Sequence, residues 1–231
     1  MSITGSNSPV PTQAVPTQAV PIQAPPRQAL PPQAVVAILR APTAHHFIRA
    51  SSVLWDAGIR CFEFTLTSEG ATDAVSAFRE LRPEAIVGVG TVRTVDQLAV
   101  AQAAGAAFAV SQIFLPRLVV RADELGMPFV PGALTPTEIV TAWESGVSLV
   151  KVSPIGPVGG VTYLNELRGP LPDIALMPTG GVTLESAGAY LSAGAAAVGV
   201  SGAVFGDALV TGDLTGLADR AAQLNSLLAG V

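Results

Sequence analysis

From residue 35 onward, short apolar runs alternate with longer stretches in which apolar and polar residues recur at helical spacing. Apolar runs bounded by Gly, Pro or polar residues predict buried strands, and the amphipathic stretches predict helices. The predicted strands cover residues 35–39, 61–66, 85–92, 108–113, 129–134, 149–154, 175–179 and 197–200. The predicted helices cover residues 44–57, 70–81, 94–104, 115–125, 135–145, 161–168, 183–193 and 214–229.

This alternation gives eight strand–helix units within one domain of residues 33–231. A helix between successive strands makes those strands parallel, and eight such units favour a closed (β/α)8 TIM barrel, an α/β fold. A doubly wound open sheet is the alternative, although it usually needs fewer units. In a barrel, alternate strand residues point inward, and functional groups gather at the C-terminal ends of the strands.

Residues 1–32 follow a different pattern. From Pro11 a pentapeptide of the form P-x-Q-A-x recurs, first as Pro11-Thr-Gln-Ala-Val and then as Pro16-Thr-Gln-Ala-Val. Proline every fifth residue removes amide donors and is incompatible with a regular helix or a central strand. We expect a disordered, extended tail that serves as a spacer, and a docking site for a partner that recognises proline motifs is the alternative.

A single lysine stands out in the sixth predicted strand. Lys151 is the only lysine of the chain, whereas the other eleven basic residues are arginine. Its neighbours in residues 149–154 are apolar and β-branched, so the amine should be buried near the end of a strand. A desolvated lysine can lose its proton and attack a carbonyl, which a guanidinium cannot do. Lys151 is therefore a candidate Schiff-base residue, and a lysine that extends its amine to solvent from a strand end is the alternative.

Strand alternation places a carboxyl group in the predicted interior. Along residues 61–66, Glu63 lies on the face opposite Phe62 and Phe64. The aromatic face should pack against helices, so Glu63 should point into the barrel. A buried acid is costly unless it has a partner or a function, and Lys151 is a plausible partner. Two interpretations stay open: a structural ion pair, or a carboxyl group that moves protons beside a reactive amine.

Other strand ends carry weaker signals. The third strand ends in Gly88-Val89-Gly90-Thr91, and Thr91 should share a face with Val87 and Val89. The seventh and eighth strands lead into Pro178-Thr179-Gly180-Gly181 and Gly199-Val200-Ser201-Gly202. Backbone amides at these two positions often hold phosphate in barrel enzymes, but tight turns need glycine for their own geometry.

Composition narrows the functional class. The chain is 49% hydrophobic and 13% charged, with net charge −5, which suits a large core and argues against nucleic acid as a partner. We expect no membrane span and no secretory signal. With a single cysteine, Cys61, the cytoplasm is the expected location. His45, His46 and that cysteine do not form a zinc site, and we expect no metal and no other cofactor.

Six short motifs, in order along the chain, together resemble a known family of enzymes. They are Ile38-Leu39-Arg40, Glu63-Phe-Thr65-Leu-Thr67, Gly88-Val-Gly90-Thr91, Pro131-Gly132, Lys151 followed by Pro154, and Pro178-Thr179-Gly180-Gly181. The set resembles the class I 2-keto-3-deoxy-6-phosphogluconate (KDPG) aldolases, some of which also act on 4-hydroxy-2-oxoglutarate. The resemblance begins at about residue 35 and excludes the tail.

The resemblance implies an enzyme that splits a 2-keto acid into pyruvate and an aldehyde without a cofactor. It implies that Lys151 forms an imine with the ketone and that Glu63 moves protons during cleavage. It also implies a homotrimer. Arg40 and Thr91 would meet the pyruvyl carboxylate. The complete set of substrate-binding residues that it implies is Arg40, Thr67, Thr91, Pro131, Thr179, Gly180, Gly181 and Ser201.

Several positions depart from the family's pattern. The aromatic residue usual two positions after the lysine is Ser153, the Ser-Pro after the fourth strand is Ser111-Gln112, and the usual Gly-Ser appears as Ser201-Gly202. Thr67 stands where many members carry arginine. These changes leave the amine and the acid in place but alter the pocket wall, so the substrate could lack a phosphate or differ in size.

Two other functions remain as alternatives. One is a non-catalytic barrel that binds a small anionic ligand or a partner, with the tail as a recruiting arm. The other is a different phosphate-binding barrel, such as an isomerase, in which Glu63 acts as a base and Lys151 forms no covalent bond.

Overall fold

The computed structural model of the chain describes residues 28–228. Its strands are β1 Ala34–Leu39, β2 Cys61–Thr65, β3 Ile86–Gly90, β4 Ala109–Val110, β5 Phe129–Val130, β6 Gly132–Ala133, β7 Val150–Val152, β8 Leu176–Pro178 and β9 Ala197–Val200. Its helices are α1 Phe47–Asp56, α2 Ala71–Leu81, α3 Val95–Ala103, α4 Pro116–Glu124, α5 Pro136–Glu144, α6 Gly160–Arg168, α7 Leu184–Ser192, α8 Gly202–Phe205, α9 Ala208–Thr211 and α10 Leu217–Leu228, with a short 3-10 helix at Gly156–Val158.

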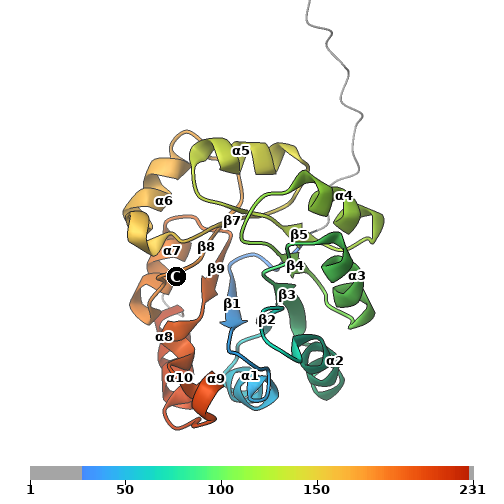
Figure 1. Ribbon diagram of the computed structural model, residues 1–231. Coiled ribbons are helices and arrows are strands. Elements are labelled where there is room, and N and C mark those ends of the chain that lie inside the picture. Colours follow the sequence, from blue (N-terminus) through green and yellow to red (C-terminus); the bar gives the residue numbers. More distant parts are fainter. Residues whose placement is uncertain (1–27, 229–231) are drawn as a thin grey trace, which may run out of the picture.

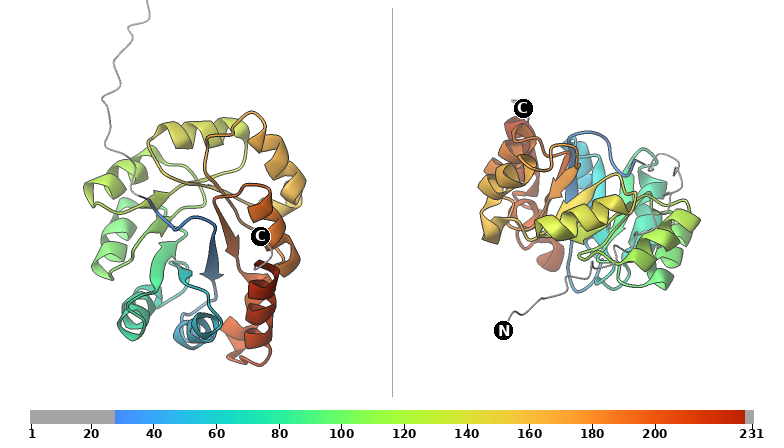
Figure 2. Two further views of the ribbon diagram at one scale, coloured as in Figure 1. Left: turned by 180° about the vertical axis from the view of Figure 1, so that it is seen from behind. Right: turned by 90° about the horizontal axis from the view of Figure 1, so that it is seen from above.

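The strands form a curled parallel sheet with helices on its outer side (Figure 1). Strands β5-β4-β3-β2-β1-β9 pair in that order, and β6-β7-β8 pair in a second group. An isolated parallel bridge between Thr179 and Gly199 joins the end of β8 to β9. The last helix, α10, lies beside α1 and α7, and the view from behind in Figure 2 again shows the red α10 next to the blue α1. The predicted alternation of strands and helices therefore gives an α/β fold with a parallel sheet.

The fifth predicted strand is interrupted. Instead of one strand over 129–134, two short strands, β5 and β6, flank Pro131 and pair with different neighbours. Proline has no N–H to donate to a ladder, and its ring fixes φ, so a strand interior is a poor place for it. The last unit also differs from the prediction, because the short helices α8 and α9 precede α10.

Side-chain caps define the start of several helices. Thr94 and Thr135 each accept a hydrogen bond from the amide three residues on, and Gln97 and Glu138 close the reciprocal bonds. These capping boxes satisfy amides that a helix leaves unpaired, and each contributes about 1 kcal/mol. The first helix has no side-chain cap: α1 begins at Phe47 after His46, and Thr43 pairs in a bridge with Glu69.

Alternating strand residues separate two apolar layers. Phe62 and Phe64 point outward and meet Phe78 of α2 and Phe47 of α1 edge-on or tilted. Residues on the opposite faces of the strands form a second cluster inside the sheet, which includes Cys61. Such aromatic packing explains why β2 takes this register, since a shift of one residue would turn both Phe62 and Phe64 inward.

The packed part of the chain begins before residue 33, where we expected the domain to start. Ala29 and Leu30 are buried against the inner cluster. The amide of Gln33 donates to the carbonyl of Ala196 at 2.7 Å, and the amide of Ala29 donates to the hydroxyl of Ser148 at 3.3 Å. This segment covers the N-terminal end of the strands. The pentapeptide repeats up to residue 27 lie outside the described residues.

The longest helix of residues 28–228 is α10, with 12 residues. A helix needs roughly 20 apolar residues to cross a bilayer, and none in this part of the chain meets that requirement. In the same part of the chain, no three His, Cys, Asp or Glu side chains come close enough together to hold a metal ion.

Candidate active site

Strand β7 places Lys151 inside the curled sheet. Its amide donates to the carbonyl of Pro131 at 2.9 Å, and the ladder sets it beside Gly132. Val150 and Val152 on either side belong to the outer apolar cluster, so the lysine side chain takes the inner face. Lys151 is only 2% exposed, which excludes the alternative of an amine that reaches bulk solvent.

Glu63 faces this amine from β2. Its side chain is fully buried, and its Oε1 lies 3.6 Å from Nζ of Lys151. That distance exceeds the usual limit of about 3.2 Å for a direct hydrogen bond. No protein group among residues 28–228 donates a hydrogen bond to either carboxylate oxygen. The two charges are therefore close enough to attract each other, while both keep hydrogen-bonding capacity for a third group.

Glycines on β3 provide the space for this carboxylate. A Cβ placed on Gly90 would lie 1.8 Å from Oε1 of Glu63, and one placed on Gly88 would lie 2.6 Å from the ring of Phe108. At Gly88 and Gly90, the inner face of β3 therefore carries no side chain and receives those of its neighbours. Sequence reasoning missed this role of Gly90. The available signal was the alternation of valine and glycine along 87–90, which leaves one strand face empty.

Arg40 and Thr91 come together at the C-terminal ends of β1 and β3. Nη2 of Arg40 donates to Oγ1 of Thr91 at 3.1 Å. Thr91 does not continue the strand face of Val87 and Val89 as we expected: β3 ends at Gly90, and Thr91 adopts φ 62°. A β-branched residue rarely takes a left-handed conformation, and such strain is most often found at functional sites.

The glycine-rich turn after β8 and the residue after β9 also lie at this end of the strands. Gly180 and Gly181 adopt φ 82° and 77°, conformations that favour glycine. Thr179 is 7% exposed, and its hydroxyl donates to the carbonyl of Met177 at 3.3 Å. Ser201 turns its hydroxyl to β1, where it donates to the carbonyl of Ile38 at 2.8 Å.

The two remaining predicted substrate-binding residues have different surroundings. Thr67 is exposed beyond the end of β2, and its hydroxyl donates to that of Thr65 at 3.3 Å. Pro131 is buried between β5 and β6, where its carbonyl accepts the amide of Lys151. The structure thus gives Pro131 a part in holding the lysine strand, which sequence reasoning did not suggest.

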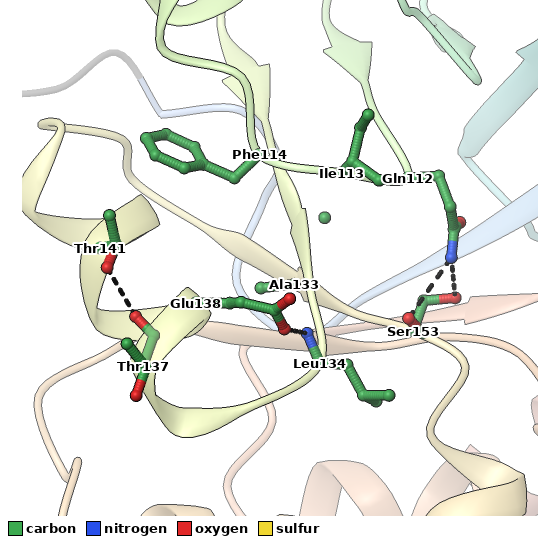
Figure 3. Close-up of a pocket in the computed structure, with 10 residues that line it drawn as sticks. Gln112, Ile113, Phe114, Ala133, Leu134, Thr137, Glu138, Thr141 and Ser153 are labelled. Atoms are coloured by element: carbon green, nitrogen blue, oxygen red, sulfur yellow. Dashed lines mark hydrogen bonds between the residues drawn. The ribbon is translucent and has the colours of Figure 1, made fainter.

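A cavity of about 440 Å³ opens beside this group (Figure 3). Residues 112–114, residues 132–134, three side chains of α5 and Ser153 line it. Nε2 of Gln112 donates to Oγ of Ser153 at 3.1 Å and to its carbonyl at 3.3 Å. In the sequence, Gln112 and Ser153 both depart from the family's pattern. They are 41 residues apart, and nothing in the sequence indicated that they bond to each other.

Comparison with known proteins supplies the family. The model of the KDPG and KHG aldolase family matches residues 27–217. A 2-dehydro-3-deoxy-phosphogluconate aldolase of Treponema pallidum is 39% identical over 158 residues, which are 68% of this chain and 74% of the relative. The KHG/KDPG aldolase of Escherichia coli is 35% identical over 193 residues, which are 82% of this chain and 91% of the relative. A solved structure described as native KDPGal has a TM-score of 0.78 at 27% identity, covering 90% of this chain and 98% of that one.

The fold and the buried amine–carboxylate pair define an α/β protein of the aldolase type. The chain belongs to the KDPG and KHG aldolase family. This confirms the resemblance drawn from the motifs and the predicted enzyme class, a carbon–carbon lyase.

Proposed function

We propose that this protein is a class I aldolase that cleaves a 2-keto-3-deoxy sugar acid or 4-hydroxy-2-oxoglutarate into pyruvate and an aldehyde. The observation that carries the proposal is the buried pair of Lys151 and Glu63, 3.6 Å apart. A primary amine in an apolar surrounding suits attack on a ketone, and a carboxylate without protein donors can exchange protons with the intermediate. The aldolase names of relatives at 35–39% identity support the same reaction.

The chemistry follows from these two groups. The Nζ of Lys151 attacks the C2 ketone to form a carbinolamine, which loses water to give an iminium. The C4 hydroxyl then loses its proton, the C3–C4 bond breaks, and its electrons move into the iminium to leave an enamine and a free aldehyde. Protonation of the enamine at C3 and hydrolysis of the imine release pyruvate and restore the amine. Glu63, directly or through water, moves the protons in these steps.

The other groups at the strand ends would orient the substrate. Arg40 and Thr91, already joined by a hydrogen bond, would meet the carboxylate of the pyruvyl part. Thr179, Gly180, Gly181 and Ser201 would meet a phosphate or a distal hydroxyl group. Thr67, exposed beyond the end of β2, would contact the substrate from the rim of the site. Pro131 would form part of the pocket wall beside Lys151.

Architecture, assembly and location belong to the proposal as well. A closed (β/α)8 barrel, with β5 and β6 sharing one strand position, is supported by the bridge between Thr179 and Gly199 and by the contact of α10 with α1. We propose a single aldolase domain, a homotrimer and a cytoplasmic location; the last residues of the expected domain, 229–231, lie outside the described residues. The reaction written above is complete without a metal or an organic cofactor.

Trapping of the imine tests the proposal. Incubation with pyruvate and borohydride should add one reduced adduct per chain, and peptide mass spectrometry should find it on Lys151. The chain suits this experiment because Lys151 is its only lysine. The Lys151→Arg variant is the control. Its one remaining primary amine is the N-terminal α-amino group, so it should take up no adduct at position 151. An intact chain that remains unlabelled while a control aldolase is labelled would refute the proposal and favour a non-catalytic barrel.

A further inference from the structure

The cavity at Ser153 lies beside the strand that carries Lys151. Lys151 and Ser153 lie two residues apart on one face of the β7 segment, and the ladder sets Lys151 beside Gly132, which lines the cavity. At about 440 Å³ the cavity lies within the size range of small-molecule sites. A substrate bound at Lys151 through C2 would therefore extend its distal carbons either toward this cavity or toward the turn at Gly180.

The lining of the cavity combines two kinds of surface (Figure 3). Gln112 and Ser153 bond to each other, and the hydroxyl of Thr141 donates to the carbonyl of Thr137 at 2.7 Å. Their oxygen atoms can still accept hydrogen bonds from hydroxyl groups of a ligand. Ile113, Phe114 and Leu134 complete the wall with apolar surface. Mixed walls of this kind suit a hydroxylated carbon chain, whose carbons pack against apolar groups while its oxygens bond to polar ones.

The charge of the lining disfavours an anionic group. Among the described residues that line the cavity there is no lysine or arginine, and the single ionisable one is an acid, Glu138. Hydrogen bonds from the backbone of Thr135 and Leu134 lower the pKa of Glu138, so it is negative at neutral pH. These bonds also occupy amides at the start of α5, which would otherwise attract an anion. A phosphate here would meet a negative charge and no basic side chain.

The alternative direction offers fewer side-chain hydroxyl and amide groups to a distal group than the cavity does. The hydroxyl of Ser201, after β9, donates a hydrogen bond to the carbonyl of Ile38. The helix that follows it, α8, has only four residues. The hydrogen bond between Gln112 and Ser153, by contrast, holds the cavity wall next to the lysine strand.

We propose that the cavity, in place of the turn at Gly180 and of Ser201, binds the uncharged, hydroxylated end of the substrate, and that the preferred substrate is a 2-keto-3-deoxy sugar acid without a phosphate group. This inference rests on the proposed aldolase function. It assigns to Gln112, Ser153 and Thr141 the selection of the distal group, and to Glu138 the rejection of phosphorylated and dicarboxylic substrates.

The first test compares three substrates on the intact protein. Release of pyruvate should be fastest from 2-keto-3-deoxygluconate, with kcat/KM about tenfold or more above that of its 6-phosphate and of 4-hydroxy-2-oxoglutarate. Equal or greater activity on the phosphate would overturn the inference, while borohydride trapping of pyruvate on Lys151 would still support the aldolase. Absence of trapping would overturn the aldolase itself, so the two failures are distinguishable.

The second test fills the cavity with a larger side chain on α5. Thr141→Phe on α5 should lower kcat/KM for 2-keto-3-deoxygluconate about tenfold and affect the 6-phosphate much less, because only the uncharged end uses this space. Glu144→Phe introduces the same side chain one turn later at an exposed position outside the cavity, and it should leave the preference unchanged. Equal losses on both substrates, or no loss on either, would show that the distal group binds elsewhere.

Discussion

The two walls that flank the reacting amine are built differently. On the side of β1 to β3, Glu63 is fully buried, and Arg40 is bonded to Thr91. On the side of β4 to β7, Gln112 is exposed and bonds to Ser153 at the edge of an open cavity. The first wall holds charged groups at fixed distances, as bond-making chemistry requires, whereas the second offers space and neutral polar atoms. A change in the second wall can therefore alter the substrate without altering the reaction.

We infer that the buried pair of Lys151 and Glu63 serves chemistry rather than stability. Desolvation of two charges offsets most of their attraction, and replacing a buried ion pair by apolar residues is often neutral or stabilising. Within residues 28–228, Glu63 also accepts none of the protein hydrogen bonds that would make its burial favourable. A structural ion pair would be expected to satisfy these oxygens, so the geometry favours the functional interpretation.

The largest effect should follow from removing the amine. Lys151→Arg keeps a positive charge near Glu63 but cannot form an imine, so we expect kcat to fall by at least about 10⁴-fold. Lys151→Ala should lose the same activity and also leave a buried carboxylate without its partner, at a cost of about 3–5 kcal/mol of folding free energy. Pyruvate release and urea unfolding measure the two quantities. Residual cleavage by the arginine variant would argue against imine chemistry.

The next effect should come from the glycine that makes room for the acid. Gly90→Ala would force the carboxylate of Glu63 to move, since the new Cβ would lie 1.8 Å from Oε1. A displacement of this kind can lower kcat about 100-fold, and it should also change the dependence of kcat on pH. Steady-state rates between pH 5 and 9 would show both changes.

Gly88→Ala is the matched control for that variant. Its Cβ would press on the ring of Phe108 at 2.6 Å rather than on the acid. Both variants should lose about 1–3 kcal/mol of stability through overpacking, but only Gly90→Ala should alter the pH profile. If the two variants lose activity equally and keep the same profile, general loosening of the interior explains the effect, and Gly90 has no positioning role.

The first wall was more predictable from sequence than the second. Strict alternation along β2 put Glu63 inside because Phe62 and Phe64 needed the helix side, and the structure follows this pattern. Lys151 could be assigned in the same way from its valine neighbours. These inferences depend only on local periodicity, which a single sequence contains.

The second wall depends on contacts between distant segments, which periodicity does not encode. The bond of Gln112 to Ser153 joins residues 41 apart and arises from how the loops after β4 and β7 meet. Pro131 divides a run that looked like one strand, and the left-handed φ of Thr91 ends another. Burial of Leu30 was missed for the same reason, because the need to cover the strands' N-terminal ends appears only once they are assembled.

Removing helix caps should have a smaller effect that distinguishes the two walls. Thr135→Ala removes the cap of α5 and loosens Glu138, whereas Thr94→Ala removes the equivalent capping box of α3, away from the cavity. Each should cost about 1 kcal/mol, which lowers Tm by about 2–4 °C for a chain of this size. Only Thr135→Ala should change KM for the uncharged substrate, by about two- to fivefold. If KM changed by a similar factor in both variants, the selectivity of the cavity would not depend on the position of Glu138.

The smallest effect concerns how accessible the first wall is to solvent. Cys61 lies on the same face of β2 as Glu63 and is 3% exposed, and burial raises its pKa to about 11. Desolvation disfavours the thiolate, so at pH 8 only roughly one thiol in 1,000 should be ionised. Native protein should therefore react with iodoacetamide far more slowly than the same chain in urea, as mass spectrometry would record. Rapid alkylation of the native protein would mean that this wall opens to solvent, and the contrast between the two walls would fail.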